Sequence, residues 1–175
     1  MVDLLPFAAA RVLDGGCGAG RTTLALGRAY RSARIVALDR FDSDYIESGG
    51  RQLLEQNLRL ADIAERVEIK RGDLTVLPFD DASFEAAVSA HAIDHLGSQI
   101  GAGLSEMLRV LRPGGRSLVV AWEPGWTMFA VANVLSLFLV SKRSWRRLAM
   151  EAGFTIADEG RFNGNWFTVL QKPKP

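Results

Sequence analysis

Residues 12–27 read VLDGGCGAGRTTLALG, a short apolar run followed by a cluster of glycines and then by a helix-forming segment. Glycine adopts backbone conformations that other residues avoid, and it lets the backbone approach a ligand closely. Free amides at the start of the following helix favour a negatively charged group. The stretch therefore predicts a strand, a ligand-binding turn and a helix, with a phosphate or a carboxylate as the bound group.

The spacing of these glycines distinguishes between two kinds of ligand. Gly16, Gly18 and Gly20 follow Asp14 in the pattern D-x-G-x-G-x-G. The dinucleotide pattern G-x-G-x-x-G does not occur, because Thr23 stands where a third glycine would be needed after Gly18 and Gly20. A dinucleotide pyrophosphate, and with it a nicotinamide oxidoreductase, is therefore disfavoured.

Composition and charge limit the classes of protein that need to be considered. The chain has 175 residues, of which 48% are hydrophobic and 23% charged, with a formal net charge of +1. This is typical of a globular protein, and we expect a single domain over residues 1–175. The small net charge gives no reason to expect a nucleic-acid partner, since domains that bind nucleic acids usually carry a strongly basic face. One cysteine excludes an internal disulfide, and the two histidines show no metal-ligand spacing, so we expect no metal site.

Short apolar runs alternate with helical periods along the chain. This alternation predicts a parallel sheet with helices on both faces. The chain then ends in two strand-like runs joined through an Asn-Gly pair, which is a hairpin signal. We therefore predict an α/β fold whose mostly parallel sheet ends in an antiparallel C-terminal hairpin. The expected strands are residues 11–14, 34–39, 66–70, 84–90, 116–122, 154–160 and 165–172, and the expected helices are about 20–30, 50–61 and 144–152.

One further helix is predicted from an apolar stripe. Its residues fall at the spacing i, i+3, i+4 and i+7, with two arginines in the expected last turn, where cations favour the helix dipole. A Pro-Gly-Gly sequence at 113–115 is expected to end it. The stripe is Leu104, Met107, Leu108 and Leu111, and the arginines are Arg109 and Arg112.

Several motifs, taken in order along residues 11–170, resemble the class I S-adenosylmethionine-dependent methyltransferases. They are VLDGGCGAG, ALD, VEIKRGDLTVLPFDDASFEAAVSAHAIDHL, EMLRVLRPGGRSLVV and EAGF. The resemblance implies a Rossmann-like class I methyltransferase fold and S-adenosyl-L-methionine as the cofactor. It also implies that the methionine half of the cofactor binds at the first loop, because ligands of open α/β sheets bind beyond the carboxyl ends of the strands.

The resemblance implies cofactor roles for three acids. Asp39 is expected to accept hydrogen bonds from the ribose diol, although an acid there can also cap the next segment. Asp73 matches a position that accepts the adenine amino group, with the amide of Leu74 beside it, and the alternative is a helix N-cap over 74–77. Asp14 is expected near the cofactor's ammonium group. The full set expected to bind the cofactor is Asp14, Gly16, Cys17, Gly18, Gly20, Asp39, Arg40, Gly72, Asp73, Leu74 and Ala90.

Two side chains invite a catalytic interpretation. Cys17 has no base placed beside it by the sequence, so we interpret it as a small residue that fills the glycine loop rather than as a nucleophile. His91 follows the strand at 84–90, where the transferred methyl group should project. It is the candidate catalytic residue, to orient or deprotonate an acceptor, and the alternative is a structural hydrogen bond. Asp94 and His95 lie in the same segment and are further candidates.

The stretch at 126–140 has 12 apolar residues among 15 and is followed by the basic sequence SKRSWRR at 141–147. The apolar stretch is expected to form a helix, which either packs as a core or cap helix or forms the wall of a pocket for an apolar acceptor. A third alternative is peripheral contact of residues 126–147 with an anionic membrane surface. A membrane span is not expected, because a span needs about 20 residues.

These observations predict an enzyme that transfers a methyl group from S-adenosyl-L-methionine to a small, apolar acceptor. The alternative is a regulatory or degenerate homologue that binds the cofactor without catalysis. We expect a cytoplasmic location, with the membrane surface as the alternative, because the N-terminus lacks a basic leader region. Only about ten residues precede the first strand, so either the acceptor site is open or the chain is a fragment of a longer protein. The acceptor, the use of a general base and the oligomeric state stay open.

Overall fold

The computed structural model describes residues 5, 9–42, 50–122, 139–162 and 165–175. Its strands form one sheet in the order β3-β2-β1-β4-β5-β7-β6. The strands are β1 (Arg11–Gly15), β2 (Arg34–Asp39), β3 (Val67–Arg71), β4 (Phe84–Ala90), β5 (Leu111–Trp122), β6 (Thr155–Phe162) and β7 (Asn165–Gln171). The α-helices are α1 (Arg21–Ala29), α2 (Arg51–Leu60), α3 (Ile100–Val110) and α5 (Lys142–Glu151), and the short 3-10 helices are η3 (Ala64–Arg66) and η4 (Ile93–Gln99).

Neighbouring strands from β3 through β5 are parallel, whereas β7 is antiparallel to both β5 and β6. The predicted α/β fold with an antiparallel C-terminal hairpin is therefore confirmed. The strand order reverses between β1 and β4, and this reversal leaves a crevice at the carboxyl ends of these two strands.

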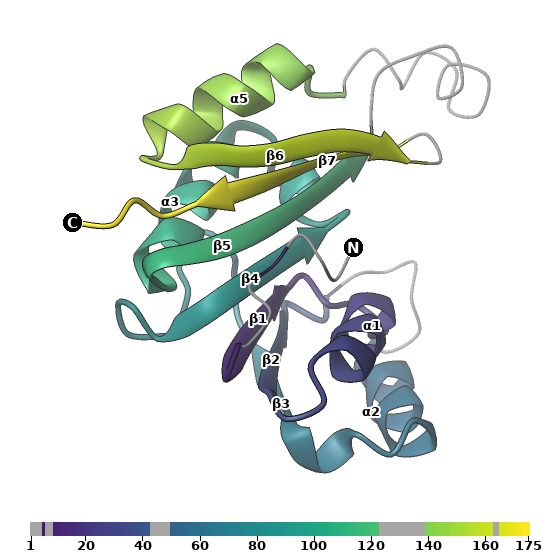
Figure 1. Cartoon of the computed structure of the whole chain (residues 1–175). Helices are drawn as coiled ribbons and strands as arrows, with labels where there is room; N and C mark the ends of the chain where they lie inside the picture. Colours follow the sequence, from purple (N-terminus) through teal and green to yellow (C-terminus); the bar gives the residue numbers. More distant parts are fainter. Residues whose placement is uncertain (1–4, 6–8, 43–49, 123–138, 163–164) are drawn as a thin grey trace.

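Both faces of the sheet are covered by helices, as its sequence requires. The central strands are apolar on both sides, so that Leu13 and Ile35 are fully buried although they belong to clusters on opposite faces. Figure 1 shows α1 and α2 against one face and α3 and α5 against the other. Trp145 of α5 and Trp166 of β7 pack together in the cluster beneath α3 and α5.

The helix predicted from the stripe at 104–111 ends earlier than expected. Leu111 has extended backbone angles and pairs with Phe84, so β5 begins there and not at Arg116. Arg112 therefore lies in a strand, and its placement in the last helical turn was wrong. The physical reason is Pro113, which disfavours helical angles in the residue before it.

Two sequence predictions fall largely outside the described residues. The helix expected at 126–140 is one, since residues 126–138 are not described and 139–140 are not helical. The Asn163-Gly164 turn is the other, although the strands on its two sides pair antiparallel, with Phe162 opposite Asn165. No helix in the described part of the chain is long and apolar enough to cross a bilayer.

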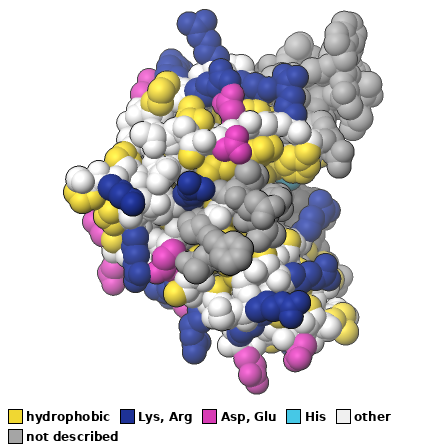
Figure 2. Space-filling view, in the orientation of Figure 1, with side chains coloured by type: hydrophobic (Ala, Val, Ile, Leu, Met, Phe, Trp, Pro, Cys, Tyr) yellow, Lys and Arg dark blue, Asp and Glu magenta, His cyan; other side chains and the backbone are white. Residues whose placement is uncertain are grey.

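Helix α5 carries the basic sequence at 141–147. Ser141 caps its N-terminus by accepting a hydrogen bond from the amide of Ser144, and Trp145 is buried against the core. A group of Lys and Arg side chains gathers at the top of the view in Figure 2, over α5. Part of this charge is paired within the chain, because Arg146 forms an ion pair with Glu159 of β6.

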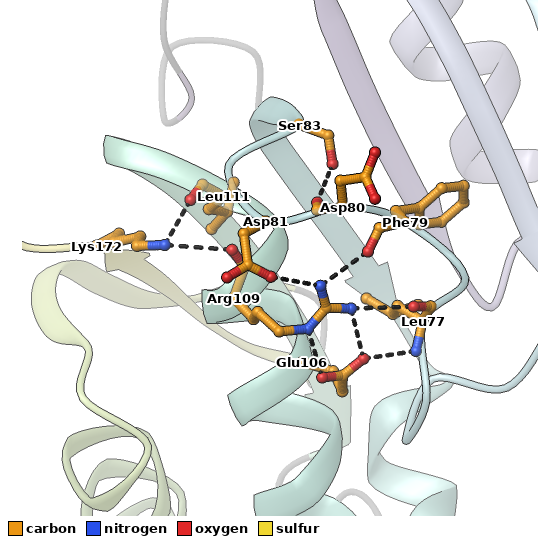
Figure 3. Close-up of polar contacts among 9 residues, drawn as sticks. All are labelled: Leu77, Phe79, Asp80, Asp81, Ser83, Glu106, Arg109, Leu111 and Lys172. Atoms are coloured by element: carbon orange, nitrogen blue, oxygen red, sulfur yellow. Dashed lines mark hydrogen bonds and ion pairs between the residues drawn. The ribbon is translucent and has the colours of Figure 1, made fainter.

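At the edge of the sheet where β4 begins, Arg109 of α3 forms hydrogen bonds to the loop between β3 and β4 (Figure 3). Its guanidinium donates to the carbonyl oxygens of Phe79 at 2.8 Å and Leu77 at 3.0 Å, and to Asp81 Oδ1 at 2.8 Å. Glu106 pairs with the same guanidinium and also accepts a hydrogen bond from the amide of Leu77 at 2.6 Å. One helix thereby fixes the end of the loop that is remote from the crevice.

A lysine that directly follows the C-terminal strand β7 completes this cluster. Lys172 Nζ donates to the carbonyl oxygens of Arg109 at 3.2 Å and Leu111 at 2.7 Å. The carbonyl of Arg109 lies in the last turn of α3, where it has no intrahelical partner, and it also accepts a hydrogen bond from the amide of Ala82 at 3.1 Å. The Lys172 contact joins the end of β7 to the junction of α3 and β5.

Candidate cofactor-binding site

A cavity of about 700 Å³ opens at the carboxyl ends of the parallel strands. It extends from the ends of β2 and β3, over the glycine loop between β1 and α1, to the ends of β4, β5 and β6 and the start of β7. The predicted site residues that line it are Gly16, Cys17, Gly18, Asp39, Arg40, Gly72, Leu74, Ala90 and His91. Three predicted residues do not line it, namely Asp14, Gly20 and Asp73.

The glycine loop adopts backbone angles that explain its composition. Gly16, Gly18 and Gly20 have φ values of 81°, 49° and 92°, in the region that favours glycine. A Cβ at Gly16 would clash with Ala92, and a Cβ at Gly20 would clash with Leu54 of α2. A Cβ at Gly18 would meet nothing within 4 Å, because this residue faces open space. Gly18 is therefore where a ligand can approach the backbone.

Asp39 connects the end of β2 to this loop. Its Oδ2 accepts a hydrogen bond from the amide of Gly18 at 2.8 Å, and its Oδ1 accepts one from the amide of Phe41 at 2.9 Å. A carboxylate has about four acceptor positions, so two or so remain for the hydroxyl groups of a ligand. Asp39 can thus hold the loop and bind a diol at the same time.

Asp14 lies beneath the glycine loop and is completely buried. Its Oδ2 accepts a hydrogen bond from Thr23 Oγ1 at 2.6 Å, while its Oδ1 has no hydrogen-bond partner among the described residues. Burial raises the pKa of Asp14 from 3.8 to about 7, and the hydrogen bond from Thr23 only partly opposes this effect. Its contact with Thr23 joins β1 to α1.

Asp73 forms a tight turn after β3. Its Oδ1 accepts hydrogen bonds from the amide and the hydroxyl of Thr75, and these bonds lower the pKa of Asp73. Residues 74–77 are not helical, and Asp73 and Val76 instead form an isolated bridge. The alternative of a helix N-cap was therefore wrong. The Oδ2 atom of Asp73 lies 3.9 Å from Nη1 of Arg40, a residue that lines the cavity.

The environment of Cys17 supports its interpretation as a filler. Its side chain is buried, and burial raises the pKa of the thiol above its ordinary value. A thiol that stays protonated is a poor nucleophile. The amides of Gly16 and Cys17 both donate to the carbonyl oxygen of Leu38, at 2.7 and 3.1 Å, which fastens the loop to β2.

His91 directly follows β4 and lines the cavity. Its φ of 55° is unusual for a residue with a side chain, and its amide donates to the carbonyl oxygen of Val120 at 2.9 Å. The imidazole stacks on Trp122, with ring centroids 4.5 Å apart. Its Nδ1 is shielded from solvent and has no hydrogen-bond partner among the described residues. Burial lowers the pKa of His91 below 6.5, against an opposing effect of Asp94.

The structure adds residues that the sequence interpretation missed. Arg21 and Thr22 line the cavity from the first turn of α1, and Trp122, Phe162 and Asn165 line it from the ends of three strands. Their positions offered a signal, since Arg21 directly follows Gly20 and Trp122 ends a predicted parallel strand. His95 also lines the cavity, whereas Asp94 does not.

This arrangement defines an α/β cofactor-binding protein in which a glycine loop and an acid after β2 share one cavity. A family model described as a methyltransferase domain matches residues 12–115, which is over half of the chain. The chain therefore belongs to the methyltransferase family, in its class I, S-adenosylmethionine-dependent branch. S-adenosyl-L-methionine is the cofactor of this family, and the open space at Gly18 and the acceptor positions of Asp39 fit it.

Two curated relatives and one solved structure illustrate the similarity. The chain is 38% identical over 114 residues to a demethylmenaquinone methyltransferase of Clavibacter sepedonicus, covering 65% of this chain and 42% of the relative. It is 33% identical over 114 residues to a fatty-acid O-methyltransferase of Mycolicibacterium smegmatis, covering 65% of this chain and 38% of the relative. A geranyl diphosphate methyltransferase in complex with GPP and sinefungin superposes with a TM-score of 0.77 and 15% identity, covering 98% of this chain and 75% of that one. The chain spans about two-fifths of the length of the first curated relatives.

Proposed function

We propose that this chain transfers the methyl group of S-adenosyl-L-methionine to a small, apolar acceptor. The observation that carries the proposal is the continuous cavity that joins Asp39 and the glycine loop to His91 and Trp122. Such a cavity has room for the cofactor at one end and for an acceptor at the other. The names of similar proteins support an apolar acceptor, since a fatty-acid O-methyltransferase is among the relatives and a geranyl diphosphate methyltransferase is among the solved structures with this fold.

In this proposal the chain's residues bind and orient the two substrates. Asp39 binds the ribose hydroxyls, Gly72 and Leu74 lie along the adenine, and the backbone at Gly18 lies along the methionine part. Asp73 supports the adenine end through its contact with Arg40, and Asp14 fixes the loop from below. The bound cofactor supplies a methyl group that is already activated by its sulfonium. Correct placement alone can then lower the barrier by about 7 to 11 kcal/mol.

We assign His91 the role of proton acceptor. It lies between the cofactor end of the cavity and the ends of β5 and β7, and burial keeps its ring uncharged at neutral pH. An uncharged imidazole can take the proton of an acceptor hydroxyl as that group becomes methylated. Arg21 and His95 also lower the pKa of His91, whereas Asp94 raises it.

Product formation separates this proposal from the alternative of a homologue that binds the cofactor without catalysis. The protein is incubated with methyl-labelled S-adenosyl-L-methionine and a metabolite extract, and labelled small molecules are separated by chromatography. Calorimetry measures cofactor binding independently. We expect binding together with a labelled product. Binding without a product under varied conditions would favour the non-catalytic homologue, and an absence of binding would contradict both functions.

A second proposal concerns location. We propose that the basic face of α5 contacts anionic membrane surfaces, as the exposed Arg143 and Arg147 support. The ion pair between Arg146 and Glu159 reduces the charge available for this contact. Flotation with phosphatidylcholine vesicles, with and without phosphatidylserine, tests it at low and high salt. Binding only to the anionic vesicles, weakened in the variant with Arg143→Gln and Arg147→Gln, is expected, and a protein that never floats would contradict the proposal.

A further inference from the structure

Three residues at the acceptor end of the cavity form one row across the sheet. Trp122 at the end of β5 pairs with Asn165 of β7, and Asn165 pairs with Phe162 at the end of β6. Residues directly opposite one another on neighbouring strands project from the same face of a sheet. All three line the cavity. The C-terminal hairpin therefore contributes a side chain from each of its strands to the site.

His91 extends this row by one strand. It follows β4, its amide bonds to Val120 of β5, and its ring stacks on Trp122 with an angle of 33° between the two ring planes. The ends of β4, β5, β7 and β6 thus present an imidazole, an indole, an amide and a phenyl ring to one cavity. We call His91, Trp122 and Phe162 the aromatic row.

The rings of the aromatic row are partly exposed yet held in position. Trp122 is 36% exposed and Phe162 is 39% exposed, whereas Trp145 and Trp166 are each 2% exposed. Phe162 contacts Phe167, with ring centroids 6.1 Å apart. Trp122 is held by the stack with His91. Large aromatic surfaces that line a cavity, and that packing has already oriented, are ready to contact a ligand.

We propose that the aromatic row binds the acceptor as a flat aromatic ring that carries a hydroxyl group, an inference that rests on the proposed function. Aromatic rings attract one another in stacked and edge-to-face arrangements beyond the effect of buried area, and a saturated ring lacks this attraction. The acceptor hydroxyl loses its proton to His91 as its oxygen bonds to the methyl carbon. The electron pair of the broken carbon–sulfur bond stays on sulfur, and His91 then releases the proton to water.

Two alcohols with the same carbon skeleton test this inference directly. 2-Naphthol is flat and aromatic, whereas decahydro-2-naphthol keeps the hydroxyl and the skeleton but is saturated. Equilibrium dialysis measures the binding of each to the full chain, with and without saturating S-adenosylhomocysteine. We expect 2-naphthol to bind about tenfold more tightly than its saturated analogue. Equal binding of the two alcohols, or tighter binding of the saturated one, would overturn the inference.

Variants locate the preference in the molecule. Trp122→Leu and Phe162→Leu should each remove most of the difference between the two alcohols, and Trp122→Phe should restore part of it. The control is Leu53→Ala in α2, where the wild-type side chain is also 39% exposed but does not line the cavity. Circular dichroism and the affinity for S-adenosyl-L-methionine verify that each variant is folded. A preference that persists in both leucine variants would contradict the inference.

The same measurements keep the two proposals distinguishable. If S-adenosyl-L-methionine binds and labelled product forms while the two alcohols bind equally, only the aromatic acceptor is wrong. If the cofactor does not bind, or if no acceptor is methylated, the proposed function fails whatever the alcohols do. A preference for 2-naphthol in the absence of product would support an aromatic ligand site on a protein that is not a methyltransferase enzyme.

Discussion

The polar groups at the two edges of the sheet, where the parallel strands begin and where they end, differ in how fully they are hydrogen-bonded. At the edge where β4 begins, the guanidinium of Arg109 meets two carbonyls and two carboxylates, and Lys172 Nζ meets two further carbonyls. At the edge where the parallel strands end, His91 Nδ1 and Asp94 Oδ1 are buried without a hydrogen-bond partner among the described residues. An unpaired buried polar atom costs about 1 to 3 kcal/mol.

This contrast assigns different tasks to the two edges. The Arg109 edge stabilises the fold, and, among the described residues, the cavity edge keeps an unpaired polar atom on His91, a residue that lines the cavity. The division follows from the topology, because the loops that connect parallel strands to the following helices all emerge at the cavity edge. Substitutions at the two edges should therefore have separable effects, either on unfolding or on binding and catalysis.

The largest effect is expected for Asp14→Asn and depends on pH. The pKa of Asp14 is about 7 in the folded chain and near 3.8 when unfolded, so folding favours its protonated form. Its contribution to stability is fully present below about pH 4 and is lost as the pH rises to 7, by about 4 kcal/mol in total. Urea unfolding measured from pH 4 to pH 8 should show that the free energy of unfolding of the variant, relative to that of the wild type, rises by this amount. Asp80→Asn, at an exposed position, is the control, and a pH-independent difference for Asp14→Asn would contradict the prediction.

Arg109→Ala should lower the free energy of unfolding by about 3 kcal/mol, because it leaves the loop carbonyls and Glu106 without their charged partner. The matched control is Arg112→Ala, which removes a more exposed arginine and should cost less than about 1 kcal/mol. Denaturant unfolding measures both. Cofactor affinity of the folded Arg109 variant should match the wild type. A change in cofactor affinity without a loss of stability would contradict the hypothesis that the Arg109 edge affects only unfolding.

His91→Gln should lower kcat about 100-fold, or about 2.7 kcal/mol, with unchanged cofactor affinity. In the wild type, the rate should rise with pH as His91 loses its proton, and it should level off at neutral pH because burial holds this pKa below 6.5. The acid limb should be absent in the variant. His95→Gln, from the same segment, should keep the acid limb but move it to slightly higher pH, because His95 lowers the pKa of His91. An identical rate profile for His91→Gln and wild type would remove His91 from the reaction.

Asp39→Ala should weaken the binding of S-adenosyl-L-methionine by about 1 to 3 kcal/mol, because the ribose hydroxyls lose a charged acceptor. Calorimetry measures this change. Asp42→Ala removes a nearby carboxylate that lines the cavity and pairs with Arg40 but does not contact the loop, and it should bind nearly as the wild type does. Equal affinities of the Asp39 variant and the wild type would show that the cavity holds the ribose elsewhere.

Much of the fold could be predicted from local patterns in the sequence. The predicted bounds of β2 and β4 coincide with the observed strands, because both are apolar runs that end at a polar or small residue. The glycine loop was recognisable because its spacing reflects backbone angles, which act within a few residues. Most of the residues predicted for the cofactor consequently do line one cavity.

What the sequence did not reveal depends on contacts between distant segments. Phe162 enters the cavity only because β7 pairs with both β5 and β6, and this register brings it beside Trp122, forty positions earlier in the chain. Asp14 was assigned to the cofactor by its motif, whereas the structure buries it against Thr23 and outside the cavity lining. Neither outcome can be read from spacing along the chain.

The bond from Gly18 to Asp39 has a consequence for how the cofactor arrives. This bond and the amides of Gly16 and Cys17 fasten the loop to β2 within the chain itself. Ordering a loop upon association consumes part of the binding free energy, and a loop that is ordered beforehand avoids this loss. The cofactor should therefore meet a nearly rigid receptor at its methionine end. Its association should proceed in one kinetic step, without a slow rearrangement of residues 16–20.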